Sequence, residues 1–247
     1  MHFNLIELWN GMNNLVRVIV LVLTIQALLC IAVTVDRVIL LIGAYRRGRK
    51  FARAVGPVLA SGDLQGSLQL ARQDRRSHLS DFIRTGVETY LDRRRRGLDQ
   101  AKAAELTARA LERKSESLGD SLNKGLNILA STGSTAPFIG LLGTVLGILN
   151  AFKLVGQEGS GGMSTIGTAI AEALIVTAYG LVVAIPSVLL YNWLSSRISR
   201  YEAGLAHARH ELVDHLAGGG TMAEGELEGA KEVPAAPISR APAASSA

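Results

Sequence analysis

The sequence has few aromatic residues, few charges and one cysteine. Of its 247 residues, 5% are aromatic and 19% charged, while 48% are hydrophobic and 26 are glycine. The single cysteine, Cys30, excludes an intrachain disulfide and a metal site built from clustered cysteines. We expect it to be a buried small residue, because Leu28 and Leu29 precede it where a lipidated cysteine requires small residues. A mean hydropathy of +0.26 with so few aromatics indicates helices packed in lipid, and therefore a membrane protein.

Sequence motifs of common enzyme classes are also missing. The chain has no GxxxxGK[ST], GxSxG or HExxH motif, so we expect no enzyme activity and no cofactor. Gly140, Gly143 and Gly147 do not form a dinucleotide loop; they lie near one face of a predicted helix and favour close helix packing.

A group of histidines and carboxylates in the C-terminal part raises the possibility of a metal site. Its order is not that of a zinc-protease helix, and charged exposed helices often have this composition, so we expect no metal there. The residues are His207, His210, Glu211, Asp214 and His215.

Three apolar runs are long enough to cross a bilayer as helices, which takes about 20 residues. They lie within residues 18–45, 125–152 and 165–194. The first helix is expected to continue past the membrane surface, because apolar residues resume after its first charges. The short, glycine-rich linker 153–164 predicts a tight helical hairpin of the second and third spans.

The charges around the spans predict how the chain is oriented. Residues 46–124 hold 18 Lys and Arg against 10 Asp and Glu, whereas segments 1–17 and 153–164 are near neutral. Because Lys and Arg concentrate on the cytoplasmic side, we expect 46–124 and the C-terminus there, with the N-terminus and the linker in the periplasm. We assign the basic run 93–96 to a solvated or lipid-facing surface and not to nucleic acid, because no aromatic residues are interleaved with it.

The segments between and after the spans have helical character. Within 46–124 we expect one helix capped by Ser61 or Asp63, a second over SHLSDFIRTGVETYLDRR, and a third starting near Leu98. The third carries an apolar seam at spacings of four and three, and nothing breaks it before the second span, so we expect one continuous helix there. The seam comprises Ala104, Ala108, Leu111, Ser115, Leu118 and Leu122.

The third span is expected to continue as a cytoplasmic helix over residues 195–217. The last segment, 218–247, has too few large apolar residues to fold, which predicts a disordered tail.

Glu172 is the one ionisable residue inside the second and third spans. A carboxylate within a span costs about 2.5–3.5 kcal/mol even on lenient insertion scales, so we expect it to face a cavity or a partner. No Lys, Arg or His in these spans neutralises it, and burial disfavours its charged form, so it is suited to bind and release a proton. The alternative is a carboxyl that stays protonated and hydrogen-bonded to a neighbouring hydroxyl, with no transport role.

Hydroxyl groups accompany Glu172 in both spans, and many are expected to bond to carbonyls of their own helix. Glu172 and Thr177 are five residues apart, roughly 140° around a helix, so they do not point at one axis. Thr177 is therefore expected to face the second span or a neighbouring subunit. The hydroxyls are Ser131, Thr132, Ser134, Thr135, Thr144, Thr165, Thr168 and Thr177.

Two sequence stretches carry a family resemblance. APFIGLLGTV lies in the second span, and the pattern AEAL…TAxGL…AIP lies in the third. Together they resemble the proton-channel family that includes ExbB and TolQ, with MotA more distant. The resemblance extends to the preceding ELTARALERKSESL helix and, more loosely, to the first span. Three spans with an external N-terminus are similar to ExbB and TolQ, whereas MotA has an additional span.

The resemblance implies an all-α protein of the bacterial inner membrane, with three transmembrane helices and long cytoplasmic helical extensions, assembled as a homopentameric ring. The second and third spans would line a pore that holds the single-span helices of an ExbD/TolR-like partner dimer. That partner would supply an intramembrane Asp, and proton passage would drive relative rotation. The matching polar positions are Glu172, as the protonatable element facing the partner, and Thr144 and Thr177, as polar relay or pore-lining groups.

Other functions stay open at this point. In a membrane scaffold, Glu172 would only stabilise assembly. An intramembrane enzyme would need a second catalytic group near Glu172, where the spans offer only hydroxyls. The sequence does not distinguish TonB-like import, Tol-type envelope maintenance and gliding motility, and proton over sodium specificity rests mainly on the resemblance.

Overall fold

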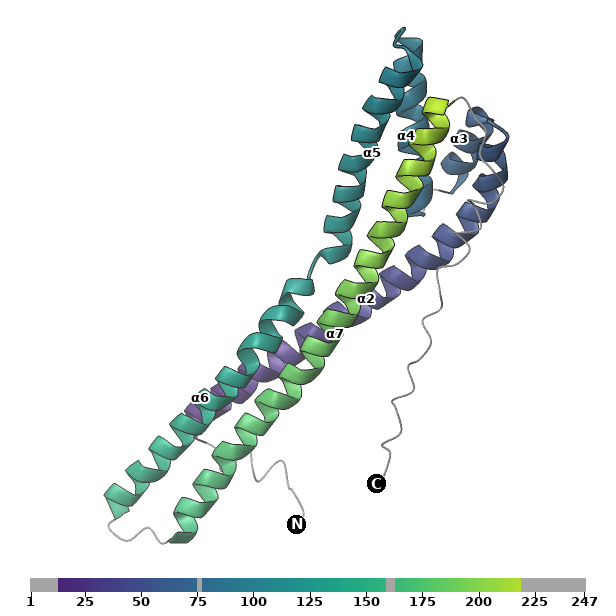
Figure 1. The fold of residues 1–247 in the computed structure, drawn as a ribbon. Coiled ribbons are helices and arrows are strands. Elements are labelled where there is room, and N and C mark those ends of the chain that lie inside the picture. Colours follow the sequence, from purple (N-terminus) through teal and green to yellow (C-terminus); the bar gives the residue numbers. More distant parts are fainter. Residues whose placement is uncertain (1–12, 75–76, 159–162, 219–247) are drawn as a thin grey trace, which may run out of the picture. The chain divides into compact units, whose positions relative to one another are not determined.

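The computed structural model describes residues 13–74, 77–158 and 163–218. Within these ranges all regular secondary structure is helical, which confirms the all-α prediction (Figure 1). The predicted disordered tail and most of segment 1–17 lie outside the described residues. The helices are α2 (Asn14–Ala60), α3 (Leu64–Gln73), α4 (His78–Arg95), α5 (Gln100–Asn123), α6 (Leu126–Glu158) and α7 (Met163–Gly218).

Three helices in the described part of the chain are long and apolar enough to cross a membrane, as predicted. They are α2, α6 and α7. Both α2 and α7 continue well past their predicted spans, in agreement with the expected extensions. α2 contains the Gly56-Pro57 pair near its end and stops at Ala60.

The predicted hairpin linker 153–164 is shorter than expected. α6 extends through Glu158 and α7 begins at Met163. The sequence KLVGQE at the end of α6 consists mainly of residues that tolerate or favour a helix, and one glycine costs only about 1 kcal/mol there.

The expected continuous helix from the α5 seam into the second span is wrong. α5 ends at Asn123, and Gly125 has a φ of +85°, a conformation that side chains disfavour and glycine adopts readily. The carbonyls freed at the end of α5 gain a donor, because Arg37 Nη1 lies 2.7 Å from the carbonyl oxygen of Ser121. A glycine in the left-handed region, together with Arg37 on α2, therefore separates α5 from α6.

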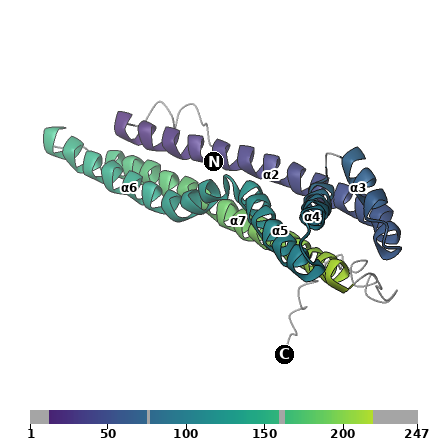
Figure 2. The same ribbon diagram turned by 90° about the horizontal axis from the view of Figure 1, so that it is seen from above.

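The contacts group the chain into two units, Met1–Ala44 with Ser117–Tyr201 and Tyr45–Glu116 with Glu202–Ala247. In the first unit, α6 and the N-terminal part of α7 run side by side, as Figures 1 and 2 show. The first half of α2 packs on them through a buried apolar cluster. The cluster comprises Val16, Ile19, Leu23, Ala136, Val176, Val183 and Ala184.

The second unit holds a separate helical core. Asp63 caps α3, as one of the two predicted candidates, by accepting a hydrogen bond from the Gly66 amide at 2.8 Å. The predicted α5 seam is buried at Ala104 and Leu111, as are Phe82 and Val87 of α4. Leu111 packs against Gly86 of α4, where an added Cβ would lie 3.2 Å from its Cδ2.

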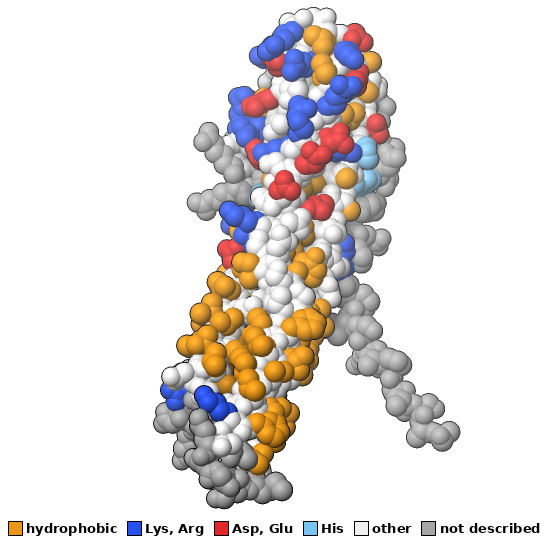
Figure 3. Space-filling model, turned by 90° about the vertical axis from the view of Figure 1, so that its left-hand side faces the viewer, with side chains coloured by type: hydrophobic (Ala, Val, Ile, Leu, Met, Phe, Trp, Pro, Cys, Tyr) orange, Lys and Arg blue, Asp and Glu red, His pale blue; other side chains and the backbone are white. Residues whose placement is uncertain are grey.

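Apolar and charged side chains separate by unit. In the space-filling view, apolar side chains gather over the part formed by the first unit and charged ones over the part formed by the second (Figure 3). Many large apolar side chains of α2, α6 and α7 are exposed on the first unit, including Phe138 at 70% and Phe152 at 65%. Such a surface is suited to lipid or to other protein chains and not to water.

Candidate functional site

The α6–α7 contact is built from small residues. A Cβ at Gly140 would lie 3.1 Å from the Cα of Thr177, and one at Gly180 would lie 2.7 Å from the carbonyl oxygen of Ala136. The glycines thus let the two backbones approach closely, which confirms that the small-residue stripe serves packing.

Thr177 lies in this contact and faces α6. Its hydroxyl donates to the carbonyl oxygen of Gly140 at 2.8 Å. This is one of the two orientations expected from its position 140° from Glu172. A hydroxyl that bonds across to the neighbouring helix fixes the register of α6 against α7.

Thr144 is buried, with 8% of its surface exposed, and it bonds within its own helix. Its hydroxyl donates to the carbonyl oxygen of Leu141 at 2.7 Å. This is the intrahelical bonding expected for many hydroxyls in the spans. The hydroxyl oxygen still has acceptor capacity.

Glu172 is half-buried at the margin of the same contact. Its neighbour Ala173 packs against Gly147, where an added Cβ would come within 2.7 Å of the Ala173 Cβ. Among the described residues, no side chain forms an ion pair or a hydrogen bond with the Glu172 carboxylate. Glu172 is therefore an unneutralised carboxylate within the apolar part of α7.

The structure brings the three predicted residues into one stretch of the α6–α7 contact. Gly140 packs on Thr177, and Gly147 packs on Ala173, so these two contacts bracket the stretch. Thr144 lies between the two glycines on α6, and Glu172 adjoins Ala173 on α7. The three side chains thus lie within about two helical turns along the contact, on different faces of their helices.

Polar contacts of the first span were not predicted. The Thr24 hydroxyl donates to the Val20 carbonyl at 2.7 Å, so its oxygen is left to accept from the Tyr179 hydroxyl at 3.0 Å. Gln26 donates to Thr135 at 3.4 Å. The sequence does indicate such contacts, because Thr24 and Gln26 are polar residues in an apolar span, where polar groups are costly and usually have a partner. These bonds tie α2 to both α6 and α7.

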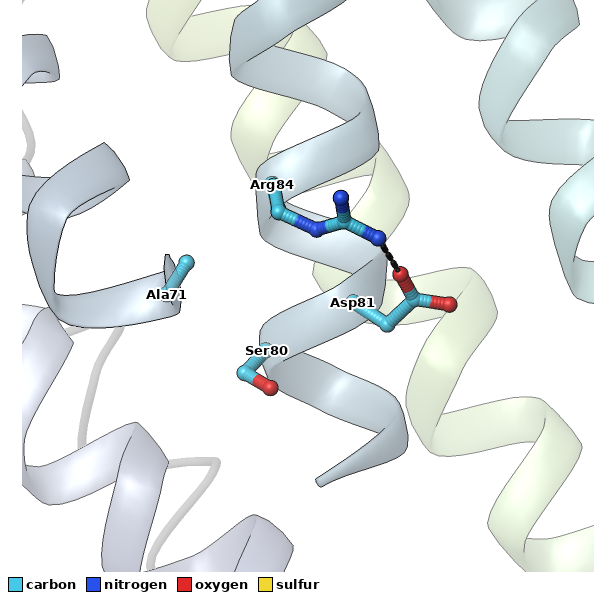
Figure 4. A pocket seen from close by; sticks show the side chains of 4 residues that line it. All are labelled: Ala71, Ser80, Asp81 and Arg84. Carbon is cyan, nitrogen blue, oxygen red and sulfur yellow. Dashed lines mark hydrogen bonds and ion pairs between the residues drawn. The ribbon is translucent and has the colours of Figure 1, made fainter. Parts of the chain in front are cut away.

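A pocket in the second unit is lined by Ala71, Ser80, Asp81 and Arg84 and has a volume of about 300 Å³ (Figure 4). The Asp81 carboxylate pairs with Arg84 and with Lys114. Partial burial acts to raise the pKa of Asp81, but hydrogen bonds from Lys114 and Arg84 outweigh it and hold the pKa below its ordinary value. The carboxylate is thus committed to an ion-pair network.

The histidines of α7 do not assemble a metal site in the described residues. His207 Nε2 lies 3.0 Å from Glu211 Oε1, a pairing one helical turn apart. His215 is buried instead, with 8% of its surface exposed. Over the described ranges, no three metal-ligating side chains converge.

Comparison with known proteins identifies the family. The model of the MotA/TolQ/ExbB proton channel family matches residues 74–206, more than half of the chain. The chain belongs to this family. The match includes Thr144, Glu172 and Thr177, whereas the first span lies before it. With three apolar helices, membership in the MotA/TolQ/ExbB family indicates a multi-pass protein of the inner membrane.

Curated relatives carry names from transport and envelope systems. The chain is 40% identical to the biopolymer transport protein ExbB of Salmonella typhimurium over 115 residues, 47% of each chain. It is 40% identical to ExbB of Pseudomonas putida over 109 residues, 44% of this chain and 33% of the relative. It is 38% identical to the Tol-Pal system protein TolQ of Pseudomonas aeruginosa over 130 residues, 51% of this chain and 56% of the relative. The chain thus matches a third to just over half of each relative's length, and none of these names denotes an enzyme.

Proposed function

We propose that this chain is the proton-channel subunit of an inner-membrane motor of ExbB/TolQ type. It couples the proton motive force to mechanical work through an ExbD/TolR-like single-span partner dimer. The proposal combines family membership with one observation, the carboxylate of Glu172 without a partner in an apolar helix. Because an isolated carboxylate in a span is costly, a group outside the described chain is needed to complete its surroundings.

The proposed assembly is a homopentameric ring around the partner helices. The exposed apolar surface of α6 and α7 supports it, because large apolar side chains left exposed by one chain are suited to contact with other chains or with lipid. These side chains would contact neighbouring subunits, the partner helices and lipid. They include Phe138, Leu141, Leu142, Val145, Leu149, Phe152, Leu174, Leu181, Val182, Ile185, Val188 and Leu189.

Within this assembly, Glu172 is the group that binds and releases the proton. Thr144 and Thr177 are polar groups beside it, and the bond of Thr177 to Gly140 keeps α7 in register. A proton crossing the membrane releases about 2.3 kcal/mol per 100 mV, which with a pH gradient suffices to bias a conformational step of a few kcal/mol.

The proposed orientation places the N-terminus and the α6–α7 turn in the periplasm. The basic segment 46–124 and the end of α7 are then cytoplasmic. The driven process is one of envelope transport, Tol-type envelope maintenance or gliding motility, and the identity of the partner will decide among them.

The first test is isolation of the tagged chain from its native membranes, followed by mass spectrometry of the intact complex. We expect about five copies of this chain with a small single-span protein that has an intramembrane Asp. A homo-oligomer that lacks such a protein, after controls for loss in detergent, would contradict the motor.

The second test separates the motor from a scaffold. In Glu172→Gln, the motor predicts a complex of normal yield that no longer performs proton-driven work. The matched variant Glu116→Gln changes an exposed carboxylate of α5 and should keep both yield and work. A scaffold in which Glu172 only stabilises assembly predicts the reverse for Glu172→Gln, with a lowered yield of complex and normal work from what remains.

A further inference from the structure

Four cations form a stripe on α2 directly after its apolar part. Arg46, Arg49, Lys50 and Arg53 are all exposed, at spacings of three, four and seven residues from the first. At 100° per residue, these positions fall within an arc of about 100° on the helix. No acidic side chain of α2 lies on this arc. We name these four residues the basic stripe.

The basic stripe points away from the packed side of α2. The buried residues of this part of the helix are Ala44, Phe51 and Val55, with 7%, 4% and 4% of their surfaces exposed. By the same helical arithmetic they lie on the opposite side, about 180° from the centre of the stripe. The stripe is therefore the outward face of α2.

The same outward face is apolar in the preceding turns of the helix. Val35, Ile39 and Ile42 are exposed by 52%, 65% and 49%, and helical periodicity aligns them with the stripe. Along the axis of α2, Arg46 lies about 6 Å beyond Ile42, and Lys50 lies about 12 Å beyond Ile42. The predicted first span ends at residue 45, so Arg46, Arg49 and Lys50 lie within about 8 Å of its end along the helix. The headgroup layer of a bilayer is about 5–7 Å thick, and long basic side chains extend toward it, so these three cations are placed to contact its phosphates.

The positive charge of the stripe is not neutralised within the described chain. None of the four cations has an ion-pair or hydrogen-bond partner among the described residues. By contrast, Arg72 pairs with Glu88, and Arg109 with Glu105. The stripe is thus available for an external anion.

We propose that the basic stripe binds the headgroups of anionic phospholipids in the leaflet that α2 leaves. The apolar face in the preceding turns would hold the acyl chains, and the guanidinium and ammonium groups would hold the phosphates. Such a surface fixes the depth of α2 in the bilayer and gathers anionic lipid around the subunit. The proposal depends on α2 crossing a bilayer and not on proton conduction, so the Glu172 variants test a separate question.

The test uses the full chain, purified in a mild detergent, freed of lipid and titrated with phosphatidylglycerol or phosphatidylethanolamine of the same acyl chains. Native mass spectrometry gives the apparent Kd of each lipid. One cation near an anionic surface changes the partition about fivefold, so the wild type should prefer phosphatidylglycerol by at least about tenfold. Raising the ionic strength should reduce this preference.

The decisive variant replaces all four stripe residues with Gln. We expect its preference for phosphatidylglycerol to fall at least about tenfold, toward none. A variant that keeps the charge, with Lys at the three arginines of the stripe, should retain the preference. The matched control replaces four exposed cations of α3 and α5 that lie outside the run 93–96, Arg72, Lys102, Arg109 and Arg113, with Gln, and it should behave as wild type.

Three results would overturn the proposal. The first is a wild type without a preference for phosphatidylglycerol. The second is an equal loss of the preference for phosphatidylglycerol in the stripe variant and the matched control. That result would show that the net charge of the chain, and not the stripe, causes the preference. The third is displacement of the lipid by soluble glycerol phosphate but not by chloride at equal ionic strength, which would make the stripe a site for free anions.

Discussion

The α6–α7 contact should not tolerate a methyl group at Gly180. Its added Cβ would lie 2.7 Å from the carbonyl oxygen of Ala136 and 3.1 Å from the Cα of Gly140. Carbon atoms pack best at about 3.5–4.0 Å, so the two backbones must separate by at least about 0.4 Å in Gly180→Ala. That separation also stretches the bond from Thr177 to Gly140, which is 2.8 Å long.

The cost of this overpacking is about 1–3 kcal/mol of unfolding free energy. For a chain of this length, 1 kcal/mol corresponds to about 2–4 °C in Tm. Thermal unfolding of the purified chain in detergent should therefore show a Tm about 2–12 °C below wild type for Gly180→Ala.

The matched control is Gly167→Ala on the same helix. A Cβ at Gly167 meets nothing within 4 Å, and alanine is the better helix former, so its Tm should equal or exceed that of wild type. An unchanged Tm for Gly180→Ala would refute the close approach of the two backbones. An equal loss of Tm in Gly180→Ala and Gly167→Ala would show that the effect does not come from the α6–α7 contact.

Three further predictions concern other contacts. Tyr179→Phe removes a hydroxyl that donates to α2 and should lower the unfolding free energy in detergent by about 0.5–1.5 kcal/mol. Tyr191→Phe should leave the unfolding free energy unchanged, because the Tyr191 hydroxyl has no partner among the described residues. Equal losses of unfolding free energy in the two variants would contradict the bond between Tyr179 and Thr24. Arg37→Gln removes the charged donor at the end of α5, so hydrogen exchange should speed up around the α5–α6 junction, and unchanged exchange would contradict this cap. Asp81 has a pKa below its ordinary value of 3.8, so its ion pairs stabilise the fold above that pH and lose effect as pH falls through the lowered pKa. The difference in unfolding free energy between wild type and Asp81→Asn should thus be constant near neutrality and shrink in acid. A difference that grows in acid would contradict the lowered pKa of Asp81.

Hydropathy and periodicity predicted most of the fold. The three long apolar helices follow from uncharged runs, and the buried α5 seam follows from spacings of three and four. The break between α5 and α6 at Gly125 could not be predicted, because composition does not distinguish a glycine with positive φ from a helical glycine such as Gly140. The end of α5 also depends on Arg37, which lies far away in the sequence.

The candidate site was predicted unevenly for similar reasons. Helical angles alone separated Thr177 from Glu172, and the bond of Thr177 to Gly140 agrees with this. The bond between Thr24 and Tyr179 joins residues far apart in the chain, and no local pattern pairs them. Pairings between helices require the register of their packing, which single-helix periodicity does not contain.

The central claim is that Glu172 carries protons, and proton flux tests it most directly. The purified complex with its partner is reconstituted into vesicles with a pH-sensitive dye inside, and a membrane potential is applied. We expect the wild type to acidify or alkalinise the lumen according to the sign of the potential, and Glu172→Gln to show only the leak of protein-free vesicles. Flux in Glu172→Gln equal to that of wild type, with both complexes intact, would contradict the account.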